Sequence, residues 1–217
     1  MLKFVFGRSG CGKSDYVFNQ IKELAICGEN NILLLTPEQY SLVAERRLLN
    51  DLGEDKVNCV DNSSFSRISN DVRRKYGSDA LPTLSKGGKV ILMCKAIDNC
   101  KDNFQLFNKN LDSLSFVTSM INIYDEMKSC NLDSLQINEL SKNIDNQVLY
   151  KKLADISLIM SAYELLIKDR FSDSSNELTR IYNQIFDKGY FKNKYVFIDG
   201  FNGFVAQEYK LLELIIA

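Results

Sequence analysis

The stretch from Gly7 to Ser14, GRSGCGKS, constrains this chain more than any other feature of its sequence. It fits the pattern G-x-x-x-x-G-K-[ST], in which glycines let backbone N–H groups turn inward around an anion. A largely apolar run, residues 2–6, precedes the loop, and a stretch with helical spacing, residues 16–24, follows it. Strand, glycine-rich loop and helix is the setting that a phosphate-binding loop requires. The sequence therefore predicts a P-loop whose strand is residues 2–6.

Within this loop, Lys13 has the reach to contact the β- and γ-phosphates, and the Ser14 hydroxyl is placed to coordinate Mg²⁺. The helix expected to begin near Lys13 adds its positive N-terminal end. The alternative, a glycine-rich turn that binds nothing, leaves the Lys-Ser pair unexplained. The residues expected to bind the nucleotide are Gly7, Arg8, Ser9, Gly10, Cys11, Gly12, Lys13 and Ser14.

An acidic residue at the end of a neighbouring strand usually completes a P-loop site by helping to hold Mg²⁺. Asp199 ends the apolar run 195–198, so we expect Asp199 and Ser14 to be the magnesium ligands. The alternative is a turn aspartate before Gly200. Many hydrolysing P-loop motors carry a glutamate at the next position, where this chain has Gly200. The sequence thus favours nucleotide binding and predicts slow turnover.

Strand and helix patterns alternate in the first third of the chain. Expected strands at 2–6, 32–35 and 56–60 enclose expected helices at 14–27 and 37–52, as in a doubly wound parallel sheet. We therefore predict an α/β fold: a P-loop NTPase domain of residues 1–63 and 192–217 with a mostly helical insertion, 64–191. The remaining expected elements are helices at 66–76, 85–99, 111–129, 146–171, 176–187 and 207–217 and a strand at 195–198.

Composition limits the classes of function. Of the 217 residues, 45% are hydrophobic and 25% charged, as in ordinary soluble domains, and no run is long enough to cross a membrane. The net charge of −1 requires any nucleic-acid contact to come from a local patch. The chain has no histidine, which excludes histidine-based triads, and its six cysteines lack zinc-site spacing. We expect these thiols to be free and mostly buried, in a reducing cytoplasm.

Two short segments are candidates for DNA contact. Thr36 and Pro37 follow the second expected strand, and Ser64, Phe65 and Arg67 combine hydroxyl, aromatic and cationic side chains that suit phosphate contact and stacking. Each has a structural alternative, since Thr36 and Pro37 also fit a helix-capping turn and Ser64 a capped helix start with Phe65 in the core. The run 73–75, Arg-Arg-Lys, is more typical of a solvated helix face than of a phosphate contact.

Four segments together resemble the N-terminal region of the AddB family, the B subunits of bacterial AddAB helicase–nucleases. They are GRSGCGKS at 7–14, LLLTPEQYSLVAERRLL at 33–49, VDNSSFSRISNDV at 60–72 and VFIDGFNGFVAQE at 196–208. The resemblance covers the whole chain, more loosely in its helical middle. It implies a RecA-like, superfamily-1 first helicase domain that uses ATP and Mg²⁺ and carries a helical accessory insertion.

The resemblance also implies a cytoplasmic role in processing double-strand DNA breaks for recombination. It implies an AddA-type partner subunit, contact with DNA ends and single-stranded DNA, and no membrane. B subunits of this family keep the ATP-binding loop but have a degenerate helicase core, and Gly200 agrees with that. The apolar, uncapped last helix, 207–217, predicts an N-terminal part of a longer protein. The resemblance implies that the family's nuclease domain lies outside this part. Whether this part is itself an enzyme stays open.

Two other hypotheses remain at this point. One is a self-contained P-loop kinase or transferase, which needs a lid carrying arginines and an acceptor site. The other is a non-hydrolysing P-loop scaffold that reads DNA. Slow or absent ATP hydrolysis with intact binding separates the kinase from the other hypotheses.

Overall fold

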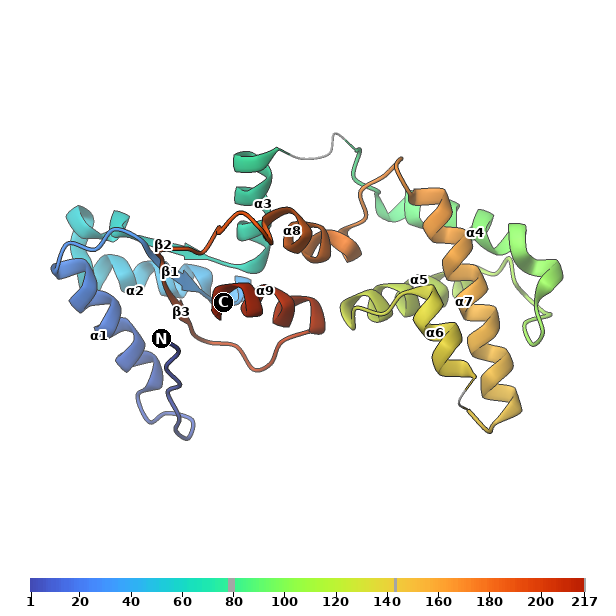
Figure 1. Ribbon diagram of the computed structural model, residues 1–217, viewed down its shortest axis with the longest axis horizontal. Helices are drawn as coiled ribbons and strands as arrows, with labels where there is room; N and C mark the ends of the chain where they lie inside the picture. The colour runs from blue at the N-terminus through green and yellow to red at the C-terminus, as the bar shows by residue number, and fades with distance from the viewer. Residues whose placement is uncertain (78–80, 143, 217) are drawn as a thin grey trace. The chain divides into compact units, whose positions relative to one another are not determined.

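A computed structural model describes residues 1–77, 81–142 and 144–216 of the chain (Figure 1). The chain divides into two compact units. The first contains residues 1–77 and the chain from Arg180 onward, and the second contains the residues between them, up to Thr179. The fold is α/β, with one small parallel sheet and mostly helices.

The sheet of the first unit has three parallel strands in the order β2-β1-β3. These are β1 (Ile32–Leu35), β2 (Val60–Ser63) and β3 (Tyr195–Ile198). Ile32 lies opposite both Val60 and Tyr195. All four side chains of the central strand β1 are buried, because parallel sheets are covered on both faces. The prediction of a buried parallel strand at 32–35 is confirmed.

Helices of the first unit pack against this sheet. Helices α1 (Lys13–Ile26) and α2 (Glu38–Lys56) pack against each other and against the sheet, with Phe18, Ile21 and Leu48 in the shared core. Gly53 has a φ of 73° and interrupts α2 where the sequence predicts its end. The other helices of this unit are α3 (Phe65–Tyr76), α8 (Glu177–Ile185) and α9 (Ala206–Ile216). Helices α3 and α8 were predicted in the insertion, but most of α8 and all of α3 lie in the first unit.

The predicted first strand, residues 2–6, is wrong for this structure, which assigns no strand there. The side chains of Leu2, Phe4 and Phe6 are exposed. A strand exists only through hydrogen bonds to a neighbour. Among the described residues no strand pairs with this segment.

The predicted strand at 56–60 is displaced toward the C-terminus. Val57–Cys59 forms a 3-10 turn, and the strand is Val60–Ser63. The sequence of β2 is VDNS, which carries little strand preference of its own. Its pairing with β1, starting at Ile32 opposite Val60, selects these residues.

The second unit is helical in its described part. It contains α4 (Lys86–Cys100), α5 (Leu114–Ser129), α6 (Ser134–Ser141) and α7 (Gln147–Ile167), with 3-10 turns at Lys101–Asn103 and Ser174–Asn176. Helix α7 packs along α4 and α6 around a core that includes Met93, Tyr124 and Tyr163. The sequence analysis missed α6. A capping box formed by Asp133 and Gln136 was the available signal.

Candidate nucleotide-binding site

The loop at 7–14 has backbone angles that require glycine. Gly10 has a φ of 76° and Gly12 a φ of 85°, both in the left-handed region. A side chain at Gly7 would overlap the Cys11 Sγ atom. Helix α1 begins directly after Gly12, and no side chain caps this end within the described structure. The N–H groups of its first turn are therefore available to an anion.

The Lys13 side chain folds across the loop. Its Nζ donates to the carbonyl oxygens of Gly7, at 2.9 Å, and Arg8, at 2.8 Å. A phosphate oxygen is a charged acceptor and bonds an ammonium more strongly than a carbonyl does. Lys13 thus bonds to two carbonyl oxygens of its own loop. With a phosphate bound in the loop, the same ammonium would donate to phosphate oxygens instead.

Ser14 and Asp199, the two predicted magnesium ligands, lie together. The Ser14 hydroxyl donates to the Asp199 Oδ1 atom at 3.1 Å, although the residues are 185 positions apart. The Asp199 N–H donates to the Leu35 carbonyl at 3.1 Å, which fixes the end of β3 against β1. The Asp199 Oδ2 atom is buried and has no hydrogen-bond partner among the described residues.

A buried carboxylate oxygen without a partner is costly, so this atom needs an explanation. Mg²⁺ takes oxygen ligands and is commonly held by one or two carboxylates together with substrate phosphates. A hydroxyl and a carboxylate beside a phosphate-binding loop fit that donor set. Asp199 and Ser14 therefore suit the cation that accompanies a bound nucleotide.

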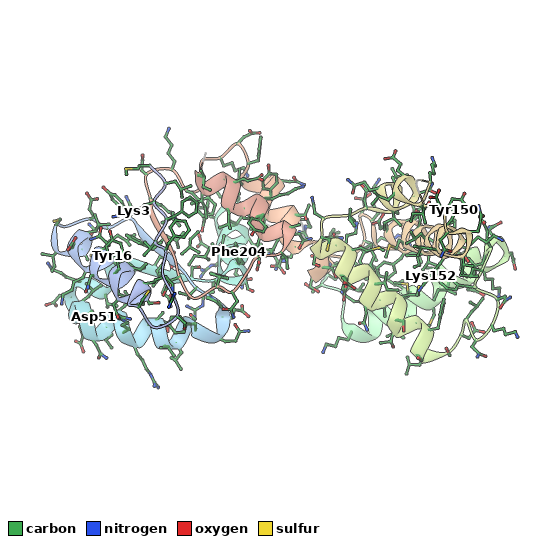
Figure 2. All side chains as sticks on the ribbon, turned by 90° about the horizontal axis from the view of Figure 1, so that it is seen from below. Lys3, Tyr16, Asp51, Tyr150, Lys152 and Phe204 are labelled. Atoms are coloured by element: carbon green, nitrogen blue, oxygen red, sulfur yellow. The ribbon has the colours of Figure 1, made fainter. Side chains whose placement is uncertain are left out.

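Helix α2 contacts the first turns of α1 through Arg47, a residue that the sequence analysis missed. The Arg47 guanidinium contacts the Asp15 Oδ1 atom at 2.6 Å and lies 4.2 Å from the centre of the Phe18 ring. The Tyr16 hydroxyl accepts a hydrogen bond from Lys3 (Figure 2). Exposed ion pairs contribute little stability, so this contact joins α2 to the first turn of α1 without adding much to the stability of the fold. No spacing in the sequence links Arg47 to Asp15.

The five residues predicted for DNA contact lie near the carboxyl ends of β1 and β2, where Leu35 is opposite Ser63. Thr36, Ser64 and Phe65 are buried. The Thr36 hydroxyl donates to the Asn62 side chain at 3.2 Å, and the Ser64 hydroxyl caps α3. Phe65 packs on Phe201 and on Phe204, which Figure 2 labels.

Pro37 and Arg67 are the more accessible members of this set. The Arg67 guanidinium contacts the Glu45 carboxylate at 2.6 Å. This hydrogen bond lowers the pKa of Glu45, so the pair is charged at neutral pH. DNA contact by this set stays a prediction.

The six cysteines form no disulfide, as predicted, but they are not mostly buried. Only Cys100 is buried, and Cys11 lies exposed within the loop. A separate pocket of about 430 Å³ lies beside β2, with Asn30, Glu45 and Asp61 in its lining. Its lining does not include residues 7–14.

No helix in the described ranges is long and apolar enough to span a membrane. A family model described as "ADDB, N-terminal" matches residues 4–217. Three proteins that are each named as the B subunit of an ATP-dependent helicase/deoxyribonuclease are similar to this chain. The protein of Clostridioides difficile is 33% identical over 99% of this chain, that of Clostridium tetani 32% over 98%, and that of Ruminiclostridium cellulolyticum 30% over 99%.

The chain spans 19% of the length of each of these relatives. The match to the family model covers nearly all of the chain, including the loop at 7–14 and Asp199. The predicted resemblance to the AddB family is confirmed. The chain belongs to the family described as ADDB, N-terminal.

Proposed function

We propose that this chain binds ATP with Mg²⁺ through residues 7–14, as the P-loop, RecA-like N-terminal region of one subunit of an ATP-dependent helicase/deoxyribonuclease. One observation carries the proposal: the Ser14 hydroxyl lies 3.1 Å from the Asp199 carboxylate. The fold brings the two predicted ligands together and leaves a buried Asp199 oxygen unpartnered among the described residues. The printed names of the relatives include ATP dependence, which agrees with this site.

In the proposed site, the loop N–H groups and Lys13 bind the phosphates. Ser14 and Asp199 hold Mg²⁺, which when bound neutralises charge on the β- and γ-phosphates. Gly200 offers no carboxylate to orient an attacking water. Such a carboxylate is worth roughly 10²- to 10⁴-fold in rate, so we propose tight binding with slow turnover.

The relatives' printed names, which describe one subunit of an ATP-dependent helicase/deoxyribonuclease, support a role on DNA beside another subunit. We propose that the full-length protein works with an AddA-type helicase–nuclease subunit on DNA ends and single-stranded DNA, in the cytoplasm, in double-strand break repair by recombination. At the carboxyl ends of β1 and β2, the side chains proposed to reach DNA are the accessible Pro37 and Arg67.

A second candidate is a non-hydrolysing P-loop scaffold for DNA reading, which Gly200 favours. The rate of ATP hydrolysis with and without single-stranded DNA distinguishes the two candidates. A helicase-type domain hydrolyses ATP faster when single-stranded DNA is present, whereas a scaffold binds ATP without DNA-stimulated hydrolysis. A P-loop kinase would transfer phosphate only to a defined acceptor.

Thermal melting with and without Mg-ATP tests the binding site directly. A ligand at about 100 times its Kd adds roughly 2.7 kcal/mol to the stability of the folded protein. For a protein of this size, that is a rise in Tm of about 5–10 °C. Lys13→Ala should abolish the rise, and Asp199→Asn should abolish the part that depends on Mg²⁺.

Lys22→Ala is the matched control, because Lys22 is an exposed lysine on the same helix. An equal rise in Lys13→Ala and in the unmutated protein would place the nucleotide elsewhere. Absence of a rise both in this chain and in the full-length protein would refute the proposal.

A further inference from the structure

Two tyrosine rings and three lysines gather on the first unit, between the end of α3 and the turn that follows α8. The rings of Tyr76 and Tyr190 lie 6.5 Å apart. The Lys188 Nζ atom is 4.4 Å from the centre of the Tyr76 ring, and the Lys194 Nζ atom is 4.4 Å from that of Tyr190. The Lys75 Nζ atom lies 5.5 Å from the centre of the Tyr76 ring and 5.6 Å from that of the Tyr190 ring. We call these five residues the lysine–tyrosine cluster.

The rings of this cluster are held in place by the fold. Tyr190 is buried, and its hydroxyl donates to the Asp71 Oδ2 atom at 2.6 Å. Burial and this hydrogen bond raise the pKa of Tyr190, so it stays a neutral phenol. The Gln184 side chain donates to the Gly77 carbonyl at 2.7 Å and ties the two segments together.

The three lysines keep their charge available. Each ammonium lies within 6 Å of an aromatic ring centre, at the distance of a cation–π contact. Within the described part of the chain, none of the three forms an ion pair with a carboxylate. Two carboxylates, Asp71 and Asp61, act electrostatically on Tyr190. Of these, Asp71 is already engaged by the Tyr190 hydroxyl and by Arg74. The result is a set of positioned positive charges in a chain whose net charge is −1.

We propose that the lysine–tyrosine cluster is a contact surface for the sugar–phosphate backbone of DNA. Ammonium groups act as point charges on phosphates, and backbone contacts fix position without reading sequence. Base stacking is not the mode here, because Tyr190 is buried and the lysines lie over the rings. An acidic peptide also carries anionic groups that pair with ammoniums, so it is the competing occupant that the test distinguishes from DNA.

The cluster shares no residue with the nucleotide site. The inference rests on the proposed function only in naming DNA as the nucleic acid. Binding should be independent of sequence and strongly dependent on salt. Each phosphate contact contributes roughly 0.9 to the slope of log affinity against log salt for duplex and about 0.7 for single strands.

The test compares two triple variants of the full chain by the anisotropy of short labelled oligonucleotides, single-stranded and duplex, across a salt series. Lys75→Ala/Lys188→Ala/Lys194→Ala should weaken binding about tenfold or more at low salt and lower the salt slope by about 2 to 3. Lys95→Ala/Lys151→Ala/Lys152→Ala removes the same charge from exposed positions of the second unit (Lys152 is labelled in Figure 2) and should change neither. The corresponding triple Lys→Arg variant of the cluster should keep most of the binding.

Two outcomes would overturn the inference. One is equal DNA affinity in the cluster variant and in its control. The other is a preference for an acidic polypeptide such as poly-glutamate over DNA. The cluster variant should keep the cooperative thermal unfolding of the unmutated protein in the absence of ATP, which shows that the variant is folded. Because this measurement does not depend on nucleotide binding, it also separates failure of this inference from failure of the proposed nucleotide site.

Discussion

At the residue scale, Gly200 shows how backbone geometry limits the chemistry of the site. Its φ is 81°, in the left-handed region, and a Cβ atom there would lie 3.4 Å from Pro37 Cδ and from Tyr40 Cδ1. Many P-loop motors carry their water-orienting glutamate at this position. Here the chain turns away from β3 in a conformation that disfavours any side chain. The positive φ and the close approach of Pro37 and Tyr40 both favour glycine at position 200, so this backbone conformation disfavours a carboxylate side chain there.

Gly200→Ala should lower the free energy of unfolding of the first unit by about 1–2 kcal/mol, because alanine is strained at positive φ. Gly203→Ala is the matched control. Gly203 is in the same loop, and no atom lies within 4 Å of a Cβ built there. Urea denaturation measures both. Equal stability of the two variants would contradict the strain argument.

At the element scale, a buried ion pair joins α4 to the turn at Ser174–Asn176. The Lys89 ammonium lies 2.8 Å from the Asp173 carboxylate and 3.0 Å from Asp125. The Ser175 hydroxyl accepts a hydrogen bond from Lys89 and lies within donating distance of both carboxylates. The side chain of Asp173 is 1% exposed, so Lys89 is what makes its charge tolerable. The ion pair therefore fastens the two ends of the second unit, where the chain enters and leaves it.

The pKa values of this pair set the pH range of its contribution. Burial opposes the charge of Asp173, but hydrogen bonds from Lys89 and the Ser175 N–H lower its pKa overall. Burial likewise opposes the charge of Lys89, yet hydrogen bonds to Asp173 and Asp125 raise its pKa overall. A lowered carboxylate pKa stabilises above the ordinary carboxylate pKa and is lost as the pH falls through the folded value. A raised lysine pKa stabilises below the ordinary lysine pKa and is lost as the pH rises through the folded value.

Lys89→Met should destabilise the second unit by about 3 kcal/mol at neutral pH, because Asp173 is left buried and charged. The change in the free energy of unfolding with pH should have the opposite sign in this variant at acid pH. The variant gains stability as the pH falls, since Asp173 becomes protonated, whereas the unmutated protein loses stability. Lys95→Met, at an exposed position of the same helix, is the control. Urea titrations at several pH values measure the effect, and the same change in stability at acid pH in the two variants would refute it.

A second buried carboxylate, Asp155 on α7, organises the loop before α5. Its oxygens accept the backbone N–H groups of Gln105, Leu106 and Phe107 at 2.8 to 2.9 Å. Together with burial, the negative charge of Asp155 raises the pKa of the nearby Cys100 thiol to about 11, burial being the larger cause. Cys100 is therefore a poor nucleophile at neutral pH. Asp155 reads in the sequence as a polar residue on an apolar helix, and only the fold reveals its partners.

At the scale of the whole molecule, each compact unit contains a hydrophobic core of its own among the described residues. One includes Leu34 of β1, and the other includes Ile159 of α7. Each core is drawn from the residues of one compact unit. Units with their own cores commonly unfold as distinct steps rather than as one.

Leu34→Ala and Ile159→Ala should therefore act on different unfolding transitions. Both side chains are fully or almost fully buried, so each truncation should cost about 2–5 kcal/mol. Calorimetry should show that Leu34→Ala lowers the transition that Mg-ATP raises, and that Ile159→Ala lowers the other. A single transition, shifted alike by both variants and by Mg-ATP, would contradict two independent units.

Features that depend on local chemistry could be predicted from the sequence. Glycine placement and hydrophobic periodicity act over a few residues, so they predict local features. These features are the loop at 7–14, the helix after it, the apolar strands at 32–35 and 195–198, and the aspartate after the last strand. The sequence also predicted Ser14 and Asp199 as a ligand pair, and the structure places their side chains 3.1 Å apart, whereas metal binding by them stays a prediction.

Features that depend on pairing across the chain required the tertiary structure. It left residues 2–6 without a strand partner in the described chain, moved β2 onto the polar VDNS segment and buried Thr36. It also placed Lys75, part of the charge run at 73–75, at the same two tyrosine rings as Lys188 and Lys194. The physical reason is the same in each case. Strand register, burial and electrostatic clustering are properties of neighbours in space, and residues distant in sequence supply those neighbours.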